Sequence, residues 1–154
     1  MSSLRIEIGA DSTTFSLDES TFVVPVGDSS LTQDIICSDP PRPEELTNAI
    51  GVVIDHLDDL LRERPDVAGV GAIVSGGVAR EIAAVELGHE PDLPVTLSRD
   101  AVEEVFRTVA TEANAERARN PGLSPAMVGT IVGACCIAVA IMRRLQLEAI
   151  EVAA

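Results

Sequence analysis

An uncharged apolar segment, Ala126–Met142 (AMVGTIVGACCIAVAIM), restricts the fold of this chain more than any other feature. It is about as long as the shortest membrane-spanning helices, and two positive residues, Arg143 and Arg144, follow it. Gly129 and Gly133 also have the GxxxG spacing of paired membrane helices. The alternative is a helix enclosed in the core of a globular domain, where small residues allow close packing. Because the segment is short and rich in alanine and glycine, it predicts a buried core helix and no membrane span.

The rest of the chain predicts an α/β fold in which this helix packs against a sheet. Three short segments joined by tight turns favour a β-meander, and later strands alternate with helices. The stiff segment Ser38–Pro43 precedes a long amphipathic helix that opens at Glu44 and stops at Pro65. The expected strands are Leu4–Gly9, Thr13–Leu17, Thr21–Val26, Val70–Val74 and Ala149–Val152, and the other expected helices are Ser29–Ile36, Val78–Leu87 and one that Ser98 caps and Asn120 stops. We therefore expect a five-stranded mixed sheet flanked by helices, in a single domain over residues 1–154.

The charge balance excludes several classes of partner and chemistry. The chain carries a formal net charge of -14, and all 11 of its positive residues are arginine. Nucleic acids and anionic membrane surfaces need a basic patch, so we expect no partner of either kind. Without lysine, the chain cannot form a lysine Schiff base or a P-loop, and it has no Trp or Tyr on which bases could stack.

The cysteines and the N-terminal residues predict a cytoplasmic protein. The three cysteines are odd in number, and Cys135 and Cys136 are adjacent, which disfavours a disulfide framework and points to a reducing compartment. These two residues lie in the apolar segment, where we expect them to be core thiols. The opening residues MSSLRIEIGA lack the basic and apolar regions of a signal peptide.

Two glycine-containing turns, each directly after a strand, are candidate anion sites. In Ile6–Phe15 (IEIGADSTTF), a strand ends in glycine and is followed by hydroxyl side chains, which can hold an anion together with backbone N–H groups. In Val74–Ala79 (VSGGVA), two glycines precede a helix whose N-terminus favours an anion. The alternatives are an ordinary hairpin turn in the first segment and a packing turn in the second.

The acidic segment Asp55–Asp59 (DHLDD) has the spacing of a helical metal site, but its position argues against one. Leu57 marks the buried face of the helix, so the acidic side chains point to solvent, and Asp58 can pair with Arg62 at i,i+4. We therefore expect a solvated helix face here. His89 has no partner that spacing can assign, and residue spacing alone yields no catalytic constellation.

Several segments occur together in a characteristic order. They are EIGADSTT (Glu7–Thr14), GDSSLT (Gly27–Thr32), CSDPPRPEEL (Cys37–Leu46), SGGV (Ser75–Val78), NPGLSPAMVGTIVGA (Asn120–Ala134) and the terminal Glu148–Val152. In this order they resemble the second lobe of the exopolyphosphatase/guanosine-pentaphosphate phosphatase (Ppx/GppA) family, over nearly the whole chain. The third segment resembles the linker of the actinobacterial branch. The resemblance implies an actin-like, ribonuclease H-like half-domain from an enzyme that releases terminal phosphate with a divalent metal such as Mg²⁺.

The departures from the family pattern fall on its phosphate-binding positions. The family's first turn reads Gly-Gly-Gly-Ser-Thr-Glu, but here Ala10 and Asp11 replace two of the glycines, and a carboxylate in a phosphate cradle repels the ligand. The other altered positions are Thr14 for an acid, Ser30 for an arginine, Met127 and Gly129 for Arg and Asp, and Ala134 for a glycine. The resemblance implies residual phosphate contacts from Gly9, Ser12, Thr13, Gly76, Gly77 and Gly133, and assigns no catalytic or metal-binding residue.

The resemblance and its departures together predict a non-catalytic relative, a pseudoenzyme that acts through a partner. The first lobe, which in the family supplies the other phosphate loop and the acid that positions water, has no counterpart in the motifs found. An apolar surface that faces this first lobe in the family would bind a second copy or a separate first-lobe protein. The alternative is half of an exopolyphosphatase that binds phosphate or polyphosphate with Mg²⁺. A third hypothesis, a small membrane-anchored protein, is supported by the apolar segment alone.

Overall fold

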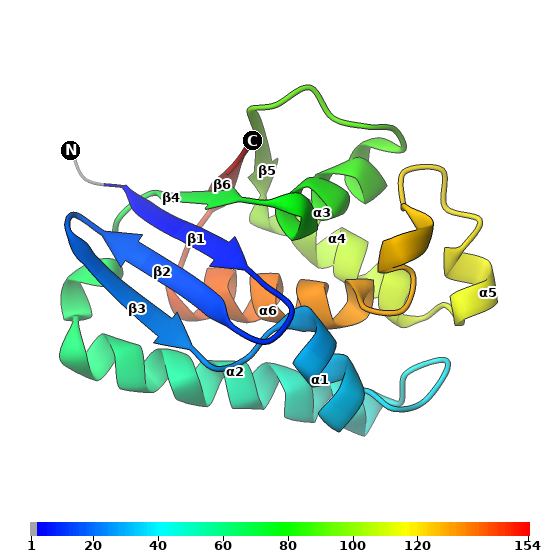
Figure 1. The fold of residues 1–154 in the computed structure, drawn as a ribbon, viewed down its shortest axis with the longest axis horizontal. Helices are drawn as coiled ribbons and strands as arrows, with labels where there is room; N and C mark the ends of the chain where they lie inside the picture. Colours follow the sequence, from blue (N-terminus) through cyan, green and yellow to red (C-terminus); the bar gives the residue numbers. More distant parts are fainter. Residues whose placement is uncertain (1–2) are drawn as a thin grey trace.

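The computed structural model describes residues 3–154, which form a six-stranded mixed sheet with helices packed against it (Figure 1). The strands are β1 (Leu4–Ile8), β2 (Thr13–Leu17), β3 (Ser20–Val24), β4 (Ala72–Ser75), β5 (Val95–Ser98) and β6 (Ala149–Ala153). Their order across the sheet is β3-β2-β1-β4-β6-β5. The strands β1 to β3 form the expected antiparallel meander, β4 runs parallel to β1 and β6, and β5 is antiparallel to β6. The mixed α/β sheet is confirmed, with six strands where the sequence predicts five.

The strand that sequence analysis missed is β5. It has four residues, follows Pro94 directly and runs without a loop into helix α4 (Arg99–Ala110). Ser98 ends the strand and caps the helix, because its Oγ accepts a hydrogen bond from the Ala101 N–H at 3.1 Å. The Ser98 cap is therefore confirmed, whereas the strand before it is too short to show an alternating pattern.

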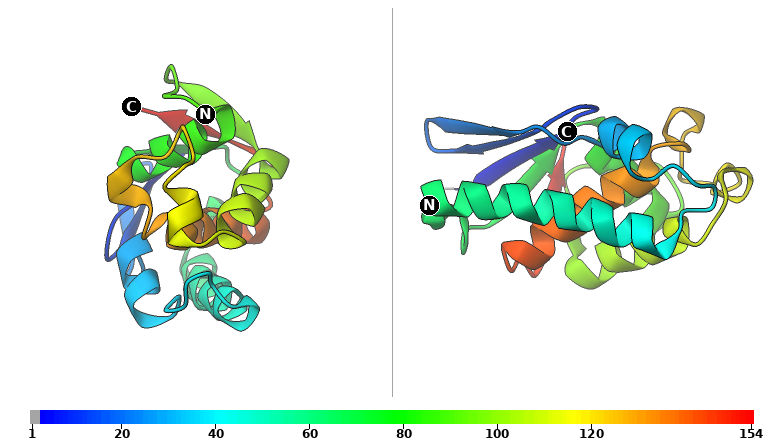
Figure 2. Two further views of the ribbon diagram at one scale, coloured as in Figure 1. Left: turned by 90° about the vertical axis from the view of Figure 1, so that its right-hand side faces the viewer. Right: turned by 90° about the horizontal axis from the view of Figure 1, so that it is seen from below.

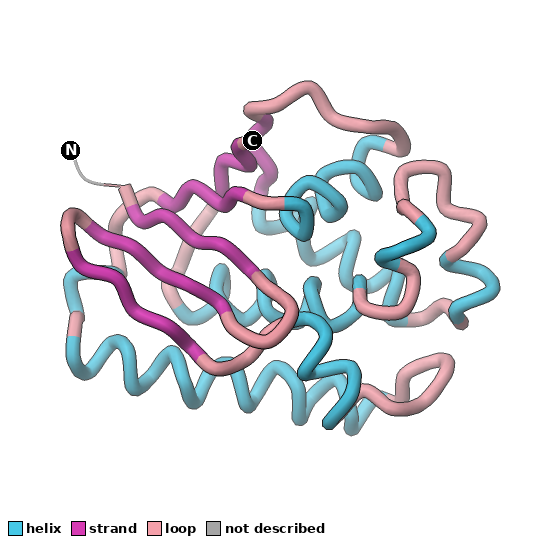
Figure 3. Tube along the Cα trace, in the orientation of Figure 1, coloured by secondary structure: helices cyan, strands magenta, loops and turns pink. Residues whose placement is uncertain are grey.

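The helices form a layer against one face of the sheet (Figures 1 and 2). They are α1 (Asp28–Asp34), α2 (Pro43–Glu63), α3 (Gly77–Leu87), α4, α5 (Asn114–Arg117) and α6 (Ile131–Arg144), with 3-10 turns at Pro65–Val67 and Pro125–Met127. Helix α6 packs against α1, α2, α3 and α4, so it forms the centre of the helical layer. Figure 3 shows the same view coloured by secondary structure, with the strands in magenta and the helices in cyan.

The apolar segment forms a core helix, as predicted. Every residue of Ile131–Met142 is buried, including Cys135 and Cys136, so both are core thiols. The helix begins five residues later than the apolar run itself, because Pro125 starts a 3-10 turn before it. Within residues 3–154, no helix combines the length and apolar character that crossing a membrane requires.

Helix α4 ends earlier than its sequence pattern predicts. The expected stop was Asn120, but the helix ends at Ala110, where the Thr111 hydroxyl donates to the Arg107 carbonyl at 2.9 Å. The chain then turns so that the Arg117 side chain points back into the molecule, where it is 3% exposed. This buried arginine fixes the bend, and the sequence gives no local signal for it.

The sheet has one apolar face and one polar face. Along β1, the side chains of Leu4, Ile6 and Ile8 are buried under the helices, whereas those between them are exposed. We call the other side of the meander the outer face; its residues are Arg5, Glu7, Thr14, Ser16, Thr21 and Val23. Within residues 3–154, only two large hydrophobic side chains are exposed, Val23 and Leu87. Few large hydrophobic side chains are therefore fully exposed in the described part of the chain.

Candidate functional site

The structure brings the two glycine-containing turns together at one edge of the sheet. They follow β1 and β4, which are parallel neighbours with Glu7 opposite Ser75. Because the carboxyl ends of parallel strands meet at the same edge, the turns lie side by side there (Figure 1). We call Gly9–Ser12 and Ser75–Gly77 together the strand-end site.

The first turn is held rigidly by hydrogen bonds to its neighbours. The Gly9 N–H donates to the Ser12 carbonyl at 2.8 Å, which closes the turn. The carbonyls of Gly9 and Ala10 accept hydrogen bonds from the first N–H groups of α1, at 3.0 to 3.1 Å. Gly27 makes this approach feasible, since a Cβ there would lie 2.3 Å from the Ala10 carbonyl. The turn therefore uses its carbonyls to cap α1, and its glycine N–H is already bonded.

The two hydroxyl residues of the first turn are placed differently. Ser12 is half-buried at the start of the strand-end site. Thr13 is buried, and its Oγ1 donates to the Val26 carbonyl at 2.7 Å. The hydroxyl of Thr13 thus ties β2 to the end of the meander. A phosphate contact from either residue stays a prediction.

The second turn places a glycine against an acidic side chain. Gly76 has a φ of 97° and caps α3, an 11-residue helix that begins with the exposed Gly77. A Cβ on Gly76 would lie 3.4 Å from Glu7 Cγ and 3.8 Å from Oε2, so the Glu7 carboxylate lies beside this turn. Glu7, Ser75 and the neighbouring Thr14 line an open hollow of about 230 Å³ on the outer face, together with Arg5, Ile6 and Ser16.

A buried carboxylate, which sequence analysis did not single out, lies beside the first turn. Asp28 opens α1 and is 4% exposed. Burial raises the pKa of Asp28, while a hydrogen bond from Thr130 and its own and the Ser29 backbone N–H groups partly offset this effect. The negative charge of Asp11 raises the pKa of Asp28 further. Two carboxylates are therefore close enough to interact where the family resemblance implies a phosphate.

Gly133, the last predicted phosphate contact, lies at a helix–helix contact. It is buried in α6, and a Cβ there would lie 2.6 Å from the Asp28 carbonyl and 3.1 Å from Thr32 Oγ1. The glycine thus allows α1 and α6 to pack closely. Its GxxxG partner Gly129 has open space around it. A ligand role for Gly133 stays a prediction.

The acidic segment on α2 is a charged helix face, as predicted, although its ion pairs differ. Asp58 pairs with Arg144 of α6, and Arg62 pairs with Asp59, so the expected Asp58–Arg62 pair is wrong. Because α2 packs beside α6, Arg144 in the last turn of α6 takes Asp58 as its partner. Arg62 then pairs with Asp59, three residues before it. Within residues 3–154, no three His, Cys, Asp or Glu side chains gather in a way that could hold a metal ion.

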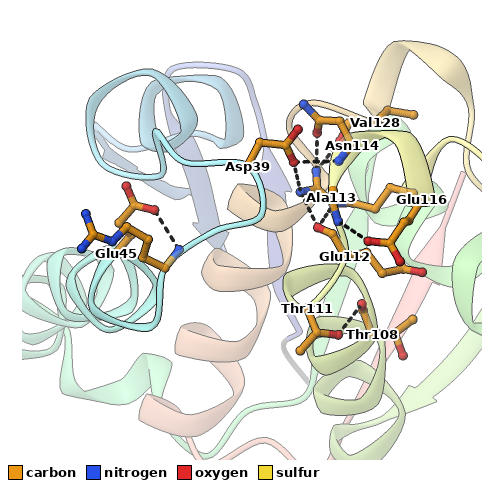
Figure 4. Close-up of polar contacts among 11 residues, drawn as sticks. Asp39, Glu45, Thr108, Thr111, Glu112, Ala113, Asn114, Glu116 and Val128 are labelled. Carbon is orange, nitrogen blue, oxygen red and sulfur yellow. Dashed lines mark hydrogen bonds and ion pairs between the residues drawn. The ribbon is translucent and has the colours of Figure 1, made fainter.

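The second polar centre that sequence analysis missed is built around Arg117. Its guanidinium donates to the Glu112 carbonyl from Nε and Nη2, and to Asn114 Oδ1 and the Val128 carbonyl from Nη1, at 2.7 to 3.1 Å. Asp39 lies 3.7 Å from Nη2 and accepts a hydrogen bond from the Asn114 N–H. Figure 4 shows these partners converging from three separate segments. The arginine joins the linker before α2, the α4–α5 bend and the entry to α6.

Comparison with solved structures identifies the fold. The chain matches an exopolyphosphatase-like protein with a TM-score of 0.92 at 16% sequence identity, over 99% of this chain and 54% of that one. It matches the Aquifex aeolicus Ppx/GppA phosphatase, type II variant, with a TM-score of 0.89 at 18% identity, over 99% and 53%. For an exopolyphosphatase from Cytophaga hutchinsonii, the TM-score is 0.84 at 17% identity, over 98% and 52%. No protein-family model and no curated protein sequence matches the chain.

These matches confirm the expected half-domain fold. The structural neighbours are Ppx/GppA proteins, and this chain spans about half the length of each. At identities below one fifth, the likeness concerns the fold, while the chemistry depends on the side chains at the strand-end site.

Proposed function

We propose that this chain is a Ppx/GppA-type lobe that does not hydrolyse phosphate by itself and acts by binding another protein. The observation that carries the proposal is the negative charge around the strand-end site. Glu7 lies against Gly76 of the second turn, Asp11 is exposed in the first, and Asp28 is buried beside it. A polyphosphate would have to bring its own negative charges close to these carboxylates, which is electrostatically unfavourable.

The backbone of the first turn supports the same proposal. A phosphate cradle needs several N–H groups that point at the ligand. Here the Gly9 N–H is bonded to Ser12, and the carbonyls of Gly9 and Ala10 face α1. The replacement of two family glycines by Ala10 and Asp11 therefore coincides with a turn whose hydrogen bonds serve the fold.

Binding of another protein is the function class that the remaining features favour. The six-stranded sheet leaves its outer face uncovered by the described helices, and its meander side chains are mostly polar. A partner at this face would therefore make hydrogen bonds and charge contacts more than apolar ones. A separate first-lobe protein or a second copy of this chain could supply such a surface.

The second candidate is half of an exopolyphosphatase-type hydrolase completed by another lobe. It is favoured by Gly76 and Gly77, which place the N-terminus of α3 at the strand-end site, beside the first turn. Within residues 3–154, no three His, Cys, Asp or Glu side chains gather into a metal site, so in this candidate Mg²⁺ would need further ligands from the other lobe or from the phosphate itself.

Phosphate release separates the two candidates. The purified chain is incubated with polyphosphate or guanosine pentaphosphate and Mg²⁺, and free phosphate is measured. We expect no release above a chain-free control. Release that Ser12→Ala abolishes would overturn the non-catalytic proposal in favour of the hydrolase.

The electrostatic argument has its own test with a matched control. Asp11→Asn removes one negative charge at the strand-end site, and Asp92→Asn removes one from an exposed loop after α3. We expect Asp11→Asn to bind polyphosphate measurably more tightly than the original chain, while Asp92→Asn leaves binding unchanged. Equal effects of both substitutions would show that overall charge, and not Asp11, controls binding.

A further inference from the structure

The edge strand β3 carries unused backbone hydrogen-bonding groups. A two-residue turn joins β2 to β3, with Leu17 opposite Ser20, so hydrogen-bonded pairs alternate along the hairpin. In this register Ser20, Phe22 and Val24 bond to β2. Thr21 and Val23 therefore point their N–H and C=O groups away from the sheet, toward the place of a further strand.

This edge lacks the usual protection against pairing. Exposed edge strands are normally shortened, charged, interrupted by proline or bulged. All five residues of β3 (STFVV) are uncharged, four of them have high strand propensity, and Val23 is 63% exposed. The opposite edge, β5, has four residues and runs directly into α4. The unprotected edge is thus confined to β3.

A groove runs beside the β3 edge. It lies between β3 and α2, has a volume of about 240 Å³, and is lined by Phe22–Pro25 with His56, Asp59, Leu60 and Glu63. The Phe22 ring, which is part of the lining, has the Arg64 guanidinium over one face, 5.3 Å from the ring centre. A strand added at this edge could therefore place alternate side chains in the groove.

The charges around the groove decide which occupant fits. Glu63 and Asp59 lie on its α2 side, and Glu19 lies in the β2–β3 turn just before β3, outside the residues that line the groove. Asp59 is paired with Arg62, whereas Glu19 and Glu63 take part in none of the ion pairs found in residues 3–154. A second copy would bring the same acidic rim and a net charge of -14 to the contact, which opposes self-pairing.

We propose that the β3 edge binds an extended, basic segment of a partner protein, which pairs with Thr21 and Val23 as a seventh strand. Main-chain hydrogen bonds would supply part of the affinity, apolar side chains would enter the groove beside Phe22, and Lys or Arg would face Glu19 and Glu63. This surface is separate from the strand-end site. If the peptide does not bind, the conclusion from the phosphate-release experiment is therefore unaffected.

The test uses a short synthetic peptide that alternates lysine and valine, and follows the backbone amide signals of the isotope-labelled chain by NMR. We expect saturable shifts centred on Thr21 and Val23. A peptide that alternates glutamate and valine, and a lysine–valine peptide with methylated backbone nitrogens, should both bind at least several-fold more weakly. Equal binding of the three peptides, or no binding of the first, would overturn the proposal.

Variants of the chain separate strand pairing from charge attraction. Val23→Pro removes one outward N–H and should abolish the shifts at Thr21, while Val23→Thr keeps the N–H and should retain binding. Glu63→Arg should weaken binding of the lysine–valine peptide several-fold without affecting the fold. Sedimentation measures whether the chain forms a dimer without peptide. A dimer that dissociates in Val23→Pro would show that a second copy of the chain occupies the edge, and would overturn the proposal.

Discussion

The side chain of Glu7 lies directly against Gly76, so that a Cβ on the glycine would sit 3.4 Å from Glu7 Cγ. This contact joins β1 to the start of α3 across the parallel pair β1–β4. It places an acid beside the turn that leads into the N-terminus of α3, where a negative charge opposes the binding of an anion. One pair of residues therefore shapes both the geometry and the charge of the strand-end site.

Gly76→Ala should destabilise the chain by about 1–3 kcal/mol, because φ 97° with ψ 172° is a conformation that only glycine adopts readily. The contact with Glu7 is of ordinary van der Waals length, so backbone strain dominates. Urea unfolding measures the change. The control is Gly51→Ala, in the middle of α2 with no neighbouring atom near its Cβ, which should stabilise by about 0.5–1 kcal/mol. Equal effects of the two would contradict the argument.

Gly133→Ala should destabilise the chain by about 1–3 kcal/mol through overpacking between α1 and α6. The added methyl would lie 2.6 Å from the Asp28 carbonyl, a backbone atom that cannot move without shifting α1. Gly129→Ala is the matched change one GxxxG step away, where nothing lies within contact distance. Thermal unfolding of both variants should show a lowered Tm for Gly133→Ala alone. Equal losses would indicate that both glycines have a role beyond this contact.

The stability of the chain should fall with rising pH through the titration of Asp28. Burial raises the folded-state pKa of Asp28 above its ordinary value of 3.8. As pH rises, the unfolded chain therefore releases this proton before the folded chain does. The contribution of the neutral carboxyl to the free energy of unfolding is complete at low pH and is lost as pH rises through the raised pKa. Asp28→Asn should remove this segment of the pH profile and be more stable than the original chain at pH 7. Urea unfolding across a pH series measures it, and an unchanged profile would contradict the assignment.

The elements with long regular patterns were predictable from sequence. The alternation in β1 and the apolar stripe of α2 define their buried faces directly. Helix α6 could be placed in the core because a helix without a polar side has no other stable environment in water. The strand β5 escaped prediction because four residues cannot establish a period, and its neighbours β6 and α4 determine its conformation.

The candidate site was predictable only in part. The two glycine turns were recognisable, but their proximity depends on β1 and β4 being parallel neighbours, a property of the sheet and not of either segment. Burial of Asp28 and Arg117 depends on residues far along the chain, Thr130 in one case and Asp39 and Val128 in the other. Charged residues carry no sequence signal for burial, because most of them are exposed.

Arg117→Met should destabilise the chain by about 1–3 kcal/mol, because it leaves the part-buried carbonyls of Glu112 and Val128 without their donor. Arg117→Lys should not restore stability, since an ammonium cannot reproduce the planar set of four hydrogen bonds. The control Arg119→Met changes an exposed arginine two residues away and should alter the unfolding free energy by less than about 0.5 kcal/mol. Full rescue by lysine would indicate that charge alone matters.

The three cysteines should differ sharply in reactivity, because only the thiolate attacks an alkylating reagent. Burial raises the pKa of Cys136 to about 12 and also raises the pKa of Cys135, and neither side chain is accessible. Cys37 is exposed in the linker before α2. Iodoacetamide at neutral pH should therefore label Cys37 alone in the folded chain and all three cysteines in urea, as read by mass spectrometry. Rapid labelling of Cys135 or Cys136 without denaturant would show that α6 opens readily, against the packing described for the core.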